Sequence, residues 1–160
     1  MLVVAWVVGV VAVVVLVGTY VTWLAARLDR LHLRAAAARR ALDAQLVRRA
    51  AAAAVLAEQA ETPQDELYLL ARAALDAPNG EREAAENDLT RRLRELDPAE
   101  AKADPALIEA VEAANRRLGL ARQVHTDSVR DALTLRQHQL VRWLGLARKH
   151  ARPAYFDIDV

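Results

Sequence analysis

The chain has 160 residues, with 22 basic and 21 acidic side chains for a net charge of +1, and it contains no cysteine. The lack of cysteine excludes disulfides, thiolate metal sites and cysteine nucleophiles. Balanced charge and the lack of a recognisable nucleic-acid-binding module give no reason to expect a nucleic-acid partner. Alanine, leucine, arginine and glutamate are abundant after residue 26, which is typical of an all-α protein.

Residues 1–26 carry no ionisable side chain, and every charged side chain follows them. A helix needs roughly 20 apolar residues to cross a hydrocarbon layer about 30 Å thick, so the run from Leu2 to Leu24 is long enough. Trp6, Tyr20 and Trp23 lie near its two ends, where aromatic side chains are common at membrane interfaces. The sequence predicts a transmembrane anchor over residues 1–26.

A secretory signal peptide is the main alternative for this segment. Signal peptides start with basic residues and have an apolar core of roughly 7–15 residues. Here the first basic residue is Arg27 and the apolar run is longer, while Ala25-Ala26 is only a weak cleavage context. We therefore expect the anchor to be retained.

Five arginines follow the anchor closely, and the N-terminal side offers only the α-amino group. Positive charge next to a span stays on the cytoplasmic side. This predicts an N-terminus outside the membrane and a cytoplasmic location for the bulk of the chain.

The rest of the chain divides into helices at its proline and glycine residues. The first helix is expected to continue to Ala60, and Thr62-Pro63 has the cap-then-proline pattern of a second helix start. A turn over residues 77–80 separates the second helix from a third, and a short helical turn begins at Asp97-Pro98. A last helix runs from about Pro105 to His150.

Short connections between these helices favour an antiparallel bundle. We predict an all-α fold in which one N-terminal transmembrane helix continues into an elongated antiparallel cytoplasmic helical bundle. The bundle covers residues 27–152, and residues 153–160 form a C-terminal tail that is extended or disordered. Self-association through the long helices is left open, because His125 and Ser128 interrupt the heptad rhythm too much for a coiled-coil prediction.

The sequence offers little that is typical of an enzyme. Ser128 is the only serine, the four histidines are scattered, and the Glu-x-x-His and His-Glu-x-x-His metal motifs, the P-loop and the dinucleotide fingerprint do not occur. We expect no enzymatic activity, no cofactor and no metal.

Two pairs of small residues within the span allow another helix to approach closely, although such pairs also arise by chance in a segment this rich in small residues. The pairs are Ala5 with Gly9 and Gly18 with Thr22. They are the candidate docking residues for integral membrane protein subunits.

Charge is distributed unevenly: residues 27–60 and 113–160 are basic and residues 61–112 are acidic. Two basic ends brought together by a folded-back bundle suit anionic lipid headgroups of the inner leaflet or a subunit surface. Solvated helix faces without a partner are the alternative. The candidate residues for this surface are Arg27, Arg30, Arg34, Arg142, Trp143, Arg148 and Lys149.

Three segments resemble the LemA family of bacterial single-span membrane proteins. Residues 42–49, Leu-Asp-Ala-Gln-Leu-Val-Arg-Arg, resemble the family's I-D-x-Q-L-x-R-R motif, and residues 121–130 resemble its Y-N-x-x-V helix. Residues 155–158 are similar to the family's Y-F-E ending. The chain departs from the pattern at His125-Thr126, which stands where the family has Tyr-Asn, and at residues 50–54, which replace an Ile-Pro segment. The Phe-Pro break of the family's last helix is also absent.

The resemblance implies an antiparallel helical bundle on an N-terminal anchor in the bacterial inner (plasma) membrane. Size, composition and the predicted topology are also similar to those of the one-span association factors of actinobacterial bcc–oxidase respiratory supercomplexes. Our first hypothesis is a non-catalytic accessory or association subunit of a larger membrane complex, for which such a respiratory supercomplex is one candidate. The second is a LemA-type signalling or stress adaptor, in which the acidic residues 81–100 recruit a soluble partner.

Overall fold

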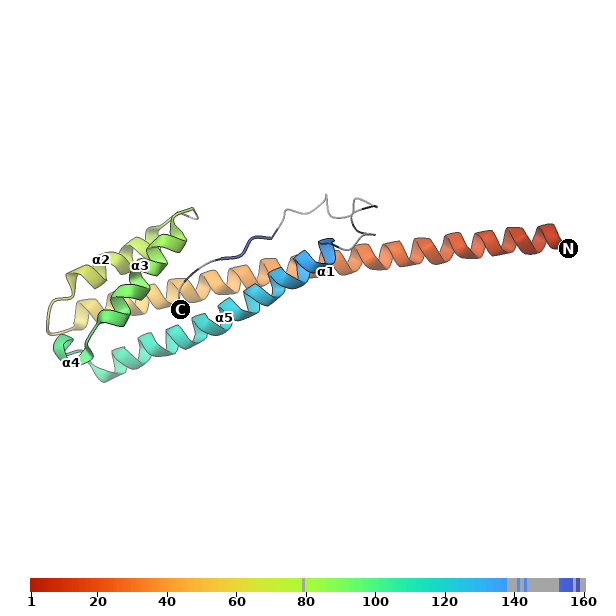
Figure 1. The fold of residues 1–160 in the computed structure, drawn as a ribbon. Helices are drawn as coiled ribbons and strands as arrows, with labels where there is room; N and C mark the ends of the chain where they lie inside the picture. Colours follow the sequence, from red (N-terminus) through yellow and green to blue (C-terminus); the bar gives the residue numbers. More distant parts are fainter. Residues whose placement is uncertain (79, 138–140, 142, 144–152, 157, 159–160) are drawn as a thin grey trace. The chain divides into compact units, whose positions relative to one another are not determined.

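The computed structural model describes the whole chain except residues 79, 138–140, 142, 144–152, 157 and 159–160. The described residues form five helices and no β-strand (Figure 1). They are α1 (Leu2–Gln59), α2 (Asp65–Asp76), α3 (Arg82–Glu95), α4 (Pro98–Ala101) and α5 (Pro105–Gln137). The predicted all-α helical bundle with a long apolar N-terminal helix is confirmed.

The chain forms two compact units, and each combines two separate segments of the sequence. The first unit comprises Met1–Ala36 and Ser128–Pro153, and the second comprises Ala37–Asp127 and Ala154–Val160. Two of the three boundaries lie inside α1 and α5, and the third lies between Pro153 and Ala154.

The helix boundaries follow the capping chemistry at α4 and α5 but not at α2. The Asp97 carboxylate accepts a hydrogen bond from the Ala99 N–H at 2.8 Å, and Asp104 does the same for Ala106. These aspartates satisfy N–H groups that the first helical turn leaves without a partner, as the sequence predicted.

The predicted start of the second helix at Thr62-Pro63 is wrong. α2 begins at Asp65, and Gln64 at its N-cap makes no side-chain capping hydrogen bond. The Thr62 N–H instead donates to the Ala101 carbonyl of α4 at 3.2 Å. The hydrogen bond to α4 thus holds Thr62 in the connection between α1 and α2, and α2 begins three residues later.

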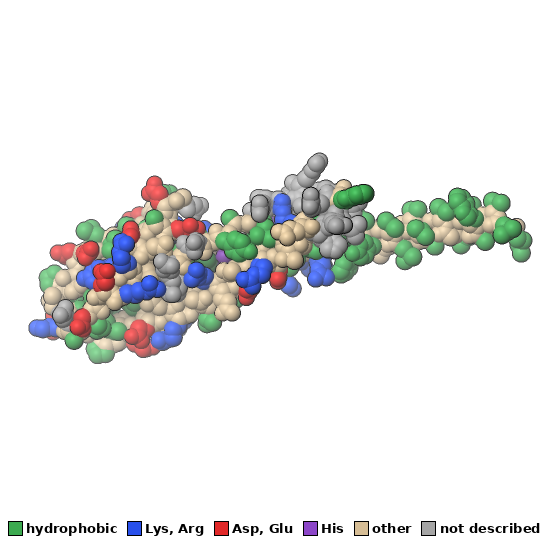
Figure 2. Space-filling view, viewed as in Figure 1, with side chains coloured by type: hydrophobic (Ala, Val, Ile, Leu, Met, Phe, Trp, Pro, Cys, Tyr) green, Lys and Arg blue, Asp and Glu red, His purple; other side chains and the backbone are tan. Residues whose placement is uncertain are grey.

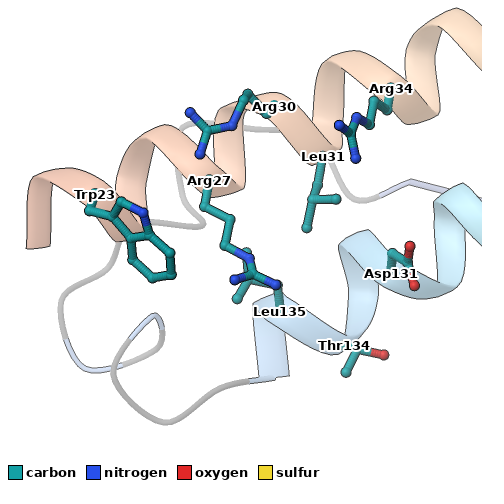
Figure 3. A pocket seen from close by; sticks show the side chains of 8 residues that line it. All are labelled: Trp23, Arg27, Arg30, Leu31, Arg34, Asp131, Thr134 and Leu135. Atoms are coloured by element: carbon teal, nitrogen blue, oxygen red, sulfur yellow. The ribbon is translucent and has the colours of Figure 1, made fainter. Parts of the chain in front are cut away.

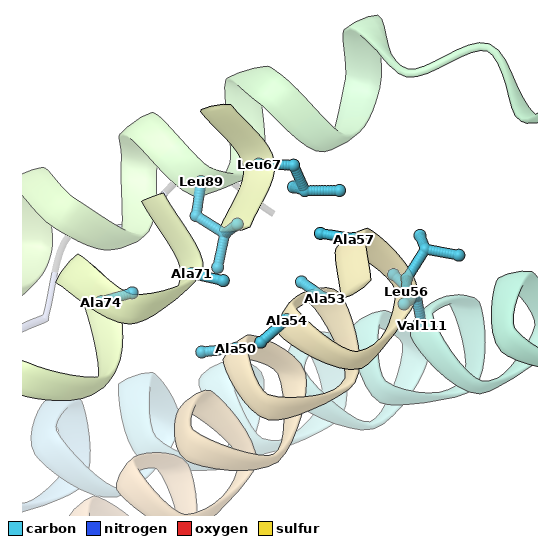
Figure 4. Packing of buried hydrophobic residues seen from close by; sticks show 10 residues of the cluster. All are labelled: Ala50, Ala53, Ala54, Leu56, Ala57, Leu67, Ala71, Ala74, Leu89 and Val111. Carbon is cyan, nitrogen blue, oxygen red and sulfur yellow. The ribbon is translucent and has the colours of Figure 1, made fainter. Parts of the chain in front are cut away.

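Small side chains dominate the main core of the second unit (Figure 4). Ala50, Ala53 and Ala57 of α1 are buried against α2 and α3, which contribute Leu67, Ala71, Ala74 and Leu89, and Val111 of α5 joins them. Alanine lets helices pack at the short end of the usual 8–10 Å axial separation. Ala54 is buried at the same contact as Ala50 and Ala53, so the alanine-rich part of α1 lies against its neighbours.

A second cluster in this unit includes the C-terminal segment. Phe156 and Ile158 are buried with Leu42, Leu46 and Leu118, and the Arg39 guanidinium lies 4.2 Å from the centroid of the Phe156 ring. Residues 153–156 and 158 have no regular secondary structure, as expected for an extended tail. The two buried side chains nevertheless make the tail part of the packed core.

The core of the first unit is small. Leu24 and Leu28 of α1 are buried with Val141, and Leu135 of α5 packs beside them. Residues 1–20 of α1 are exposed throughout. The predicted last helix is described as far as Gln137, and most of its expected continuation to His150 lies outside the described residues.

Candidate functional site

The N-terminal part of α1 is long and apolar enough to cross a membrane. Its most hydrophobic 18-residue window has a mean hydropathy of 2.8, and none of that window is buried. Figure 2 shows this part of α1 covered with hydrophobic side chains and free of charged ones on the face in view. A continuous exposed apolar surface of this kind is the signature of a segment that contacts lipid or another protein.

The predicted docking pair Ala5 and Gly9 lies in a shallow apolar groove on this helix. Trp6, Val10 and Val13 are among the other side chains that line the groove. A Cβ atom added at Gly9 would meet nothing within 4 Å in the described chain. The space over Gly9 is therefore open to the backbone of another helix.

The other predicted pair, Gly18 and Thr22, lies on a different face. Gly9 and Gly18 are separated by about two and a half turns of α-helix, which places them on opposite sides of α1. The Thr22 hydroxyl donates to the carbonyls of Gly18 and Thr19, at 3.1 and 2.9 Å, so the hydroxyl is engaged within its own helix. One straight partner helix can pack against only one of the two pairs, and the groove favours Ala5 with Gly9.

Arg27, Arg30 and Arg34 line one pocket, in which Leu135 is one of the side chains from α5 (Figure 3). They repeat at the three- and four-residue spacing that places side chains on one helix face. The Arg27 guanidinium lies 5.4 Å from the centroid of the Trp23 ring, which is within cation–π distance. The structure thus brings these three predicted residues together.

The other predicted surface residues are not part of this pocket as described. Trp143 is 91% exposed. Arg142, Arg148 and Lys149 lie outside the described residues.

Sequence reasoning missed a buried ion pair in the second unit. Arg49 of α1 and Glu86 of α3 are 1% and 0% exposed, and the Arg49 Nη2 donates to the Glu86 Oε2 at 2.6 Å. The Arg49 Nη1 donates to the Thr90 hydroxyl at 2.8 Å, and this hydroxyl donates to the Glu86 carbonyl at 2.9 Å. Arg49 is the last residue of the LemA-like motif, but the spacing of residues within one helix cannot identify a partner on another.

The polar groups of this network are only partly satisfied. The Glu86 Oε1 and the Arg49 Nε are buried and have no hydrogen-bond partner in the described chain. Burial raises the pKa of the Glu86 carboxyl above its ordinary value, while the hydrogen bond and charge of Arg49 and the charge of Arg82 oppose the rise. A cavity of about 140 Å³ adjoins Arg49 and Thr90. The Glu86 carboxylate is thus held by the Arg49 guanidinium in a buried ion pair, which we interpret as a structural interaction between α1 and α3.

His125 is buried as well, at 2% exposed, and is not part of the Arg49–Glu86 network. Burial lowers the pKa of His125 below its ordinary value, the charge of Arg39 lowers it further, and Asp43 acts in the opposite direction. The imidazole is therefore stable in its neutral form inside the fold.

The free energy of unfolding should consequently depend on pH through His125. The unfolded chain takes up a proton at His125 near pH 6.5, whereas the folded chain takes it up only at lower pH, so stability is complete above about 6.5 and falls as the pH drops below it. Unfolding curves of the full chain and of His125→Gln, measured from neutral to mildly acidic pH, test this. The variant should lose part of the pH dependence, and equal slopes for both chains would contradict the assignment.

The described residues hold no group of three or more histidine, aspartate or glutamate side chains that could bind a metal ion. No family model, curated protein or solved structure matches this chain. The resemblance to the LemA family rests on the quoted segments, and the resemblance to the supercomplex factors rests on size, composition and predicted topology.

Proposed function

We propose that this chain is a non-catalytic accessory subunit of a larger membrane protein complex, held in the bacterial inner membrane by α1. The observation that carries the proposal is the exposed apolar stretch over residues 1–20. It belongs to the same unbroken helix, α1, as the buried residues further along the chain. A lipid bilayer requires every backbone group in a span to be hydrogen-bonded internally, and a continuous helix fulfils this condition. The N-terminus faces outward and the residues after the span lie in the cytoplasm, because the arginines follow the span.

The groove at Ala5 and Gly9 is the proposed contact with an integral subunit. Helices in lipid associate through close packing because lipid tails are as apolar as leucine, so contacts form where small residues let backbones approach. Gly9 offers such a contact, and no side chain within 4 Å in the described chain fills it.

A second candidate function is that of an adaptor that recruits a soluble protein with a basic surface. It is favoured by exposed acidic residues on α2, α3 and their flanks. Asp65, Asp76, Glu81 and Glu95 are all exposed. In this case the span is only an anchor, and no integral subunit accompanies the chain in stoichiometric amounts.

Substitution of Gly9 tests the first function, with Gly18 as the matched control. A Cβ atom added at either position meets nothing within 4 Å in the described chain, and both positions are exposed, so neither Gly9→Leu nor Gly18→Leu should alter the fold. We expect Gly9→Leu to release an integral partner that the wild-type chain and Gly18→Leu retain. The measurement is a pull-down of tagged full-length chain in mild detergent, resolved by native electrophoresis and identified by mass spectrometry.

Each result separates the candidates. Stoichiometric integral subunits, respiratory ones included, that are lost with Gly9→Leu support the accessory subunit and its docking face. Retention of the partner by Gly9→Leu refutes the docking face, and recovery of soluble proteins alone favours the adaptor.

A further inference from the structure

The pocket at the end of the apolar stretch has an unusual lining. It has a volume of about 480 Å³, in the range of small-molecule sites. Its described lining contains three arginines and a single acid, Asp131. Arg30 and Arg34 make no ion pair or hydrogen bond with any side chain in the described part of the chain. Both guanidinium groups therefore border the pocket from exposed positions without an ion-pair partner in the described chain.

We propose that this pocket binds the phosphate of an anionic phospholipid headgroup. The proposal rests on the membrane insertion of α1 proposed above. Guanidinium groups bind phosphate through paired N–H donors, and several can share the oxygens of one phosphate. Three arginines against one aspartate leave a net charge of +2 in the lining, which suits an anion.

The position of the pocket along α1 fits the headgroup layer. The headgroup region on each side of the hydrocarbon core is roughly 5–8 Å thick, and Arg30 and Arg34, the two arginines without a partner, differ in axial position by about 6 Å. Arg27 lies about 4.5 Å nearer the span than Arg30. Side chains on a helix tilt toward its N-terminus, which here is toward the membrane. Figure 3 shows the Arg30 side chain directed toward the Trp23 end of the pocket.

The apolar part of the lining favours a lipid over a free phosphate ion. Trp23 is 48% exposed, and Leu31 and Leu135 contribute hydrocarbon surface next to the arginines. The Thr134 hydroxyl donates to the Arg130 carbonyl at 2.9 Å, so the guanidinium groups are the donors available to a ligand. A headgroup brings both a phosphate for the arginines and glycerol and acyl carbons for these apolar side chains.

The test is lipid binding by the full-length chain in mild detergent, followed by native mass spectrometry. The probes are phosphatidylglycerol and phosphatidylcholine with the same acyl chains, together with soluble glycerophosphate and inorganic phosphate. We expect tighter binding of phosphatidylglycerol than of phosphatidylcholine. Because each arginine near an anionic headgroup contributes about five-fold in affinity, Arg30→Gln with Arg34→Gln should weaken phosphatidylglycerol binding about 25-fold.

The control is Arg48→Gln with Arg117→Gln, which makes the same charge change at exposed residues outside the pocket. It should bind phosphatidylglycerol as the wild type does. Equal binding of both lipids, or equal loss in both double variants, would overturn the proposal. Binding of glycerophosphate or inorganic phosphate as strong as that of phosphatidylglycerol would assign the pocket to a soluble anion and refute the lipid.

Membrane extraction distinguishes this inference from the function on which it rests. The double variant in the pocket should stay in the alkali-washed membrane fraction, because the span is unchanged. A wild-type chain that alkali extracts refutes the membrane anchor itself. A chain that stays in the membrane but shows no lipid preference refutes only the headgroup site.

Discussion

Replacing Glu86 by alanine should lower the free energy of unfolding by about 3–5 kcal/mol. The substitution leaves the Arg49 guanidinium, which is 1% exposed, without its carboxylate partner. The cost comes mainly from the uncompensated buried charge rather than from the lost attraction. Urea unfolding of the full-length chain in detergent, followed by helical circular dichroism, measures the change through the midpoint and the slope of the transition.

Two further variants make the reason for the loss testable. Asp76→Ala breaks an exposed ion pair, in which the Arg72 side chain is 51% exposed and the Asp76 side chain 71%. Its loss should lower the free energy of unfolding by less than about 0.5 kcal/mol. Arg49→Met combined with Glu86→Leu removes both charges and should recover most of the stability lost in Glu86→Ala. A Glu86→Ala chain within about 1 kcal/mol of the wild type would show that the Arg49 charge is hydrated after all.

Two arginines in the middle of the span should prevent membrane insertion. Residues 2–23 contain 13 valine and leucine side chains, which together favour insertion by about 4–8 kcal/mol at roughly 0.3–0.6 kcal/mol each. Val10→Arg with Val14→Arg adds a cost of about 5–7 kcal/mol, which cancels most or all of this gain. We expect the variant in the alkali-soluble fraction and the wild type in the membrane pellet.

The matched control keeps the same positions apolar. Val10→Leu with Val14→Leu should stay in the pellet. Both residues are exposed in the described chain, so neither double variant should disturb the packed units. An arginine variant that sediments with the membrane as fully as the leucine variant would mean that contacts other than the span hold the chain there.

The sequence predicts the helices well because local signals specify them. The apolar run specifies the first part of α1, and the high helix propensity of alanine favours the rest of it. Asp97 and Asp104 each bond an N–H group only two residues further along the chain. The start of α2 is the exception, because the Thr62 N–H bonds to Ala101 and no local pattern reports that contact. Burial of Phe156 and Ile158 was missed for the same reason, since their partners on α1 and α5 are far away in sequence.

The candidate sites were predictable in part. Spacing alone places Arg27, Arg30 and Arg34 on one face, and the small-residue pairs are visible as patterns. That Gly9 and Gly18 lie on opposite faces follows once α1 is one unbroken α-helix. The Arg49–Glu86 pair could not be predicted, because a chain with 22 basic and 21 acidic side chains offers too many pairings to select one without the packing.

The most direct test of a membrane-spanning α1 with an outside N-terminus is cysteine accessibility, which is clean because the natural chain has no cysteine. Leu2→Cys and Val47→Cys both place the thiol at exposed positions, one at the start of the apolar stretch and one after its end. A membrane-impermeant maleimide applied to intact spheroplasts should label Leu2→Cys, and should label Val47→Cys only after the membrane is permeabilised. Labelling of Val47→Cys in intact spheroplasts, or loss of the Leu2→Cys label because the segment has been cleaved off, would contradict the account.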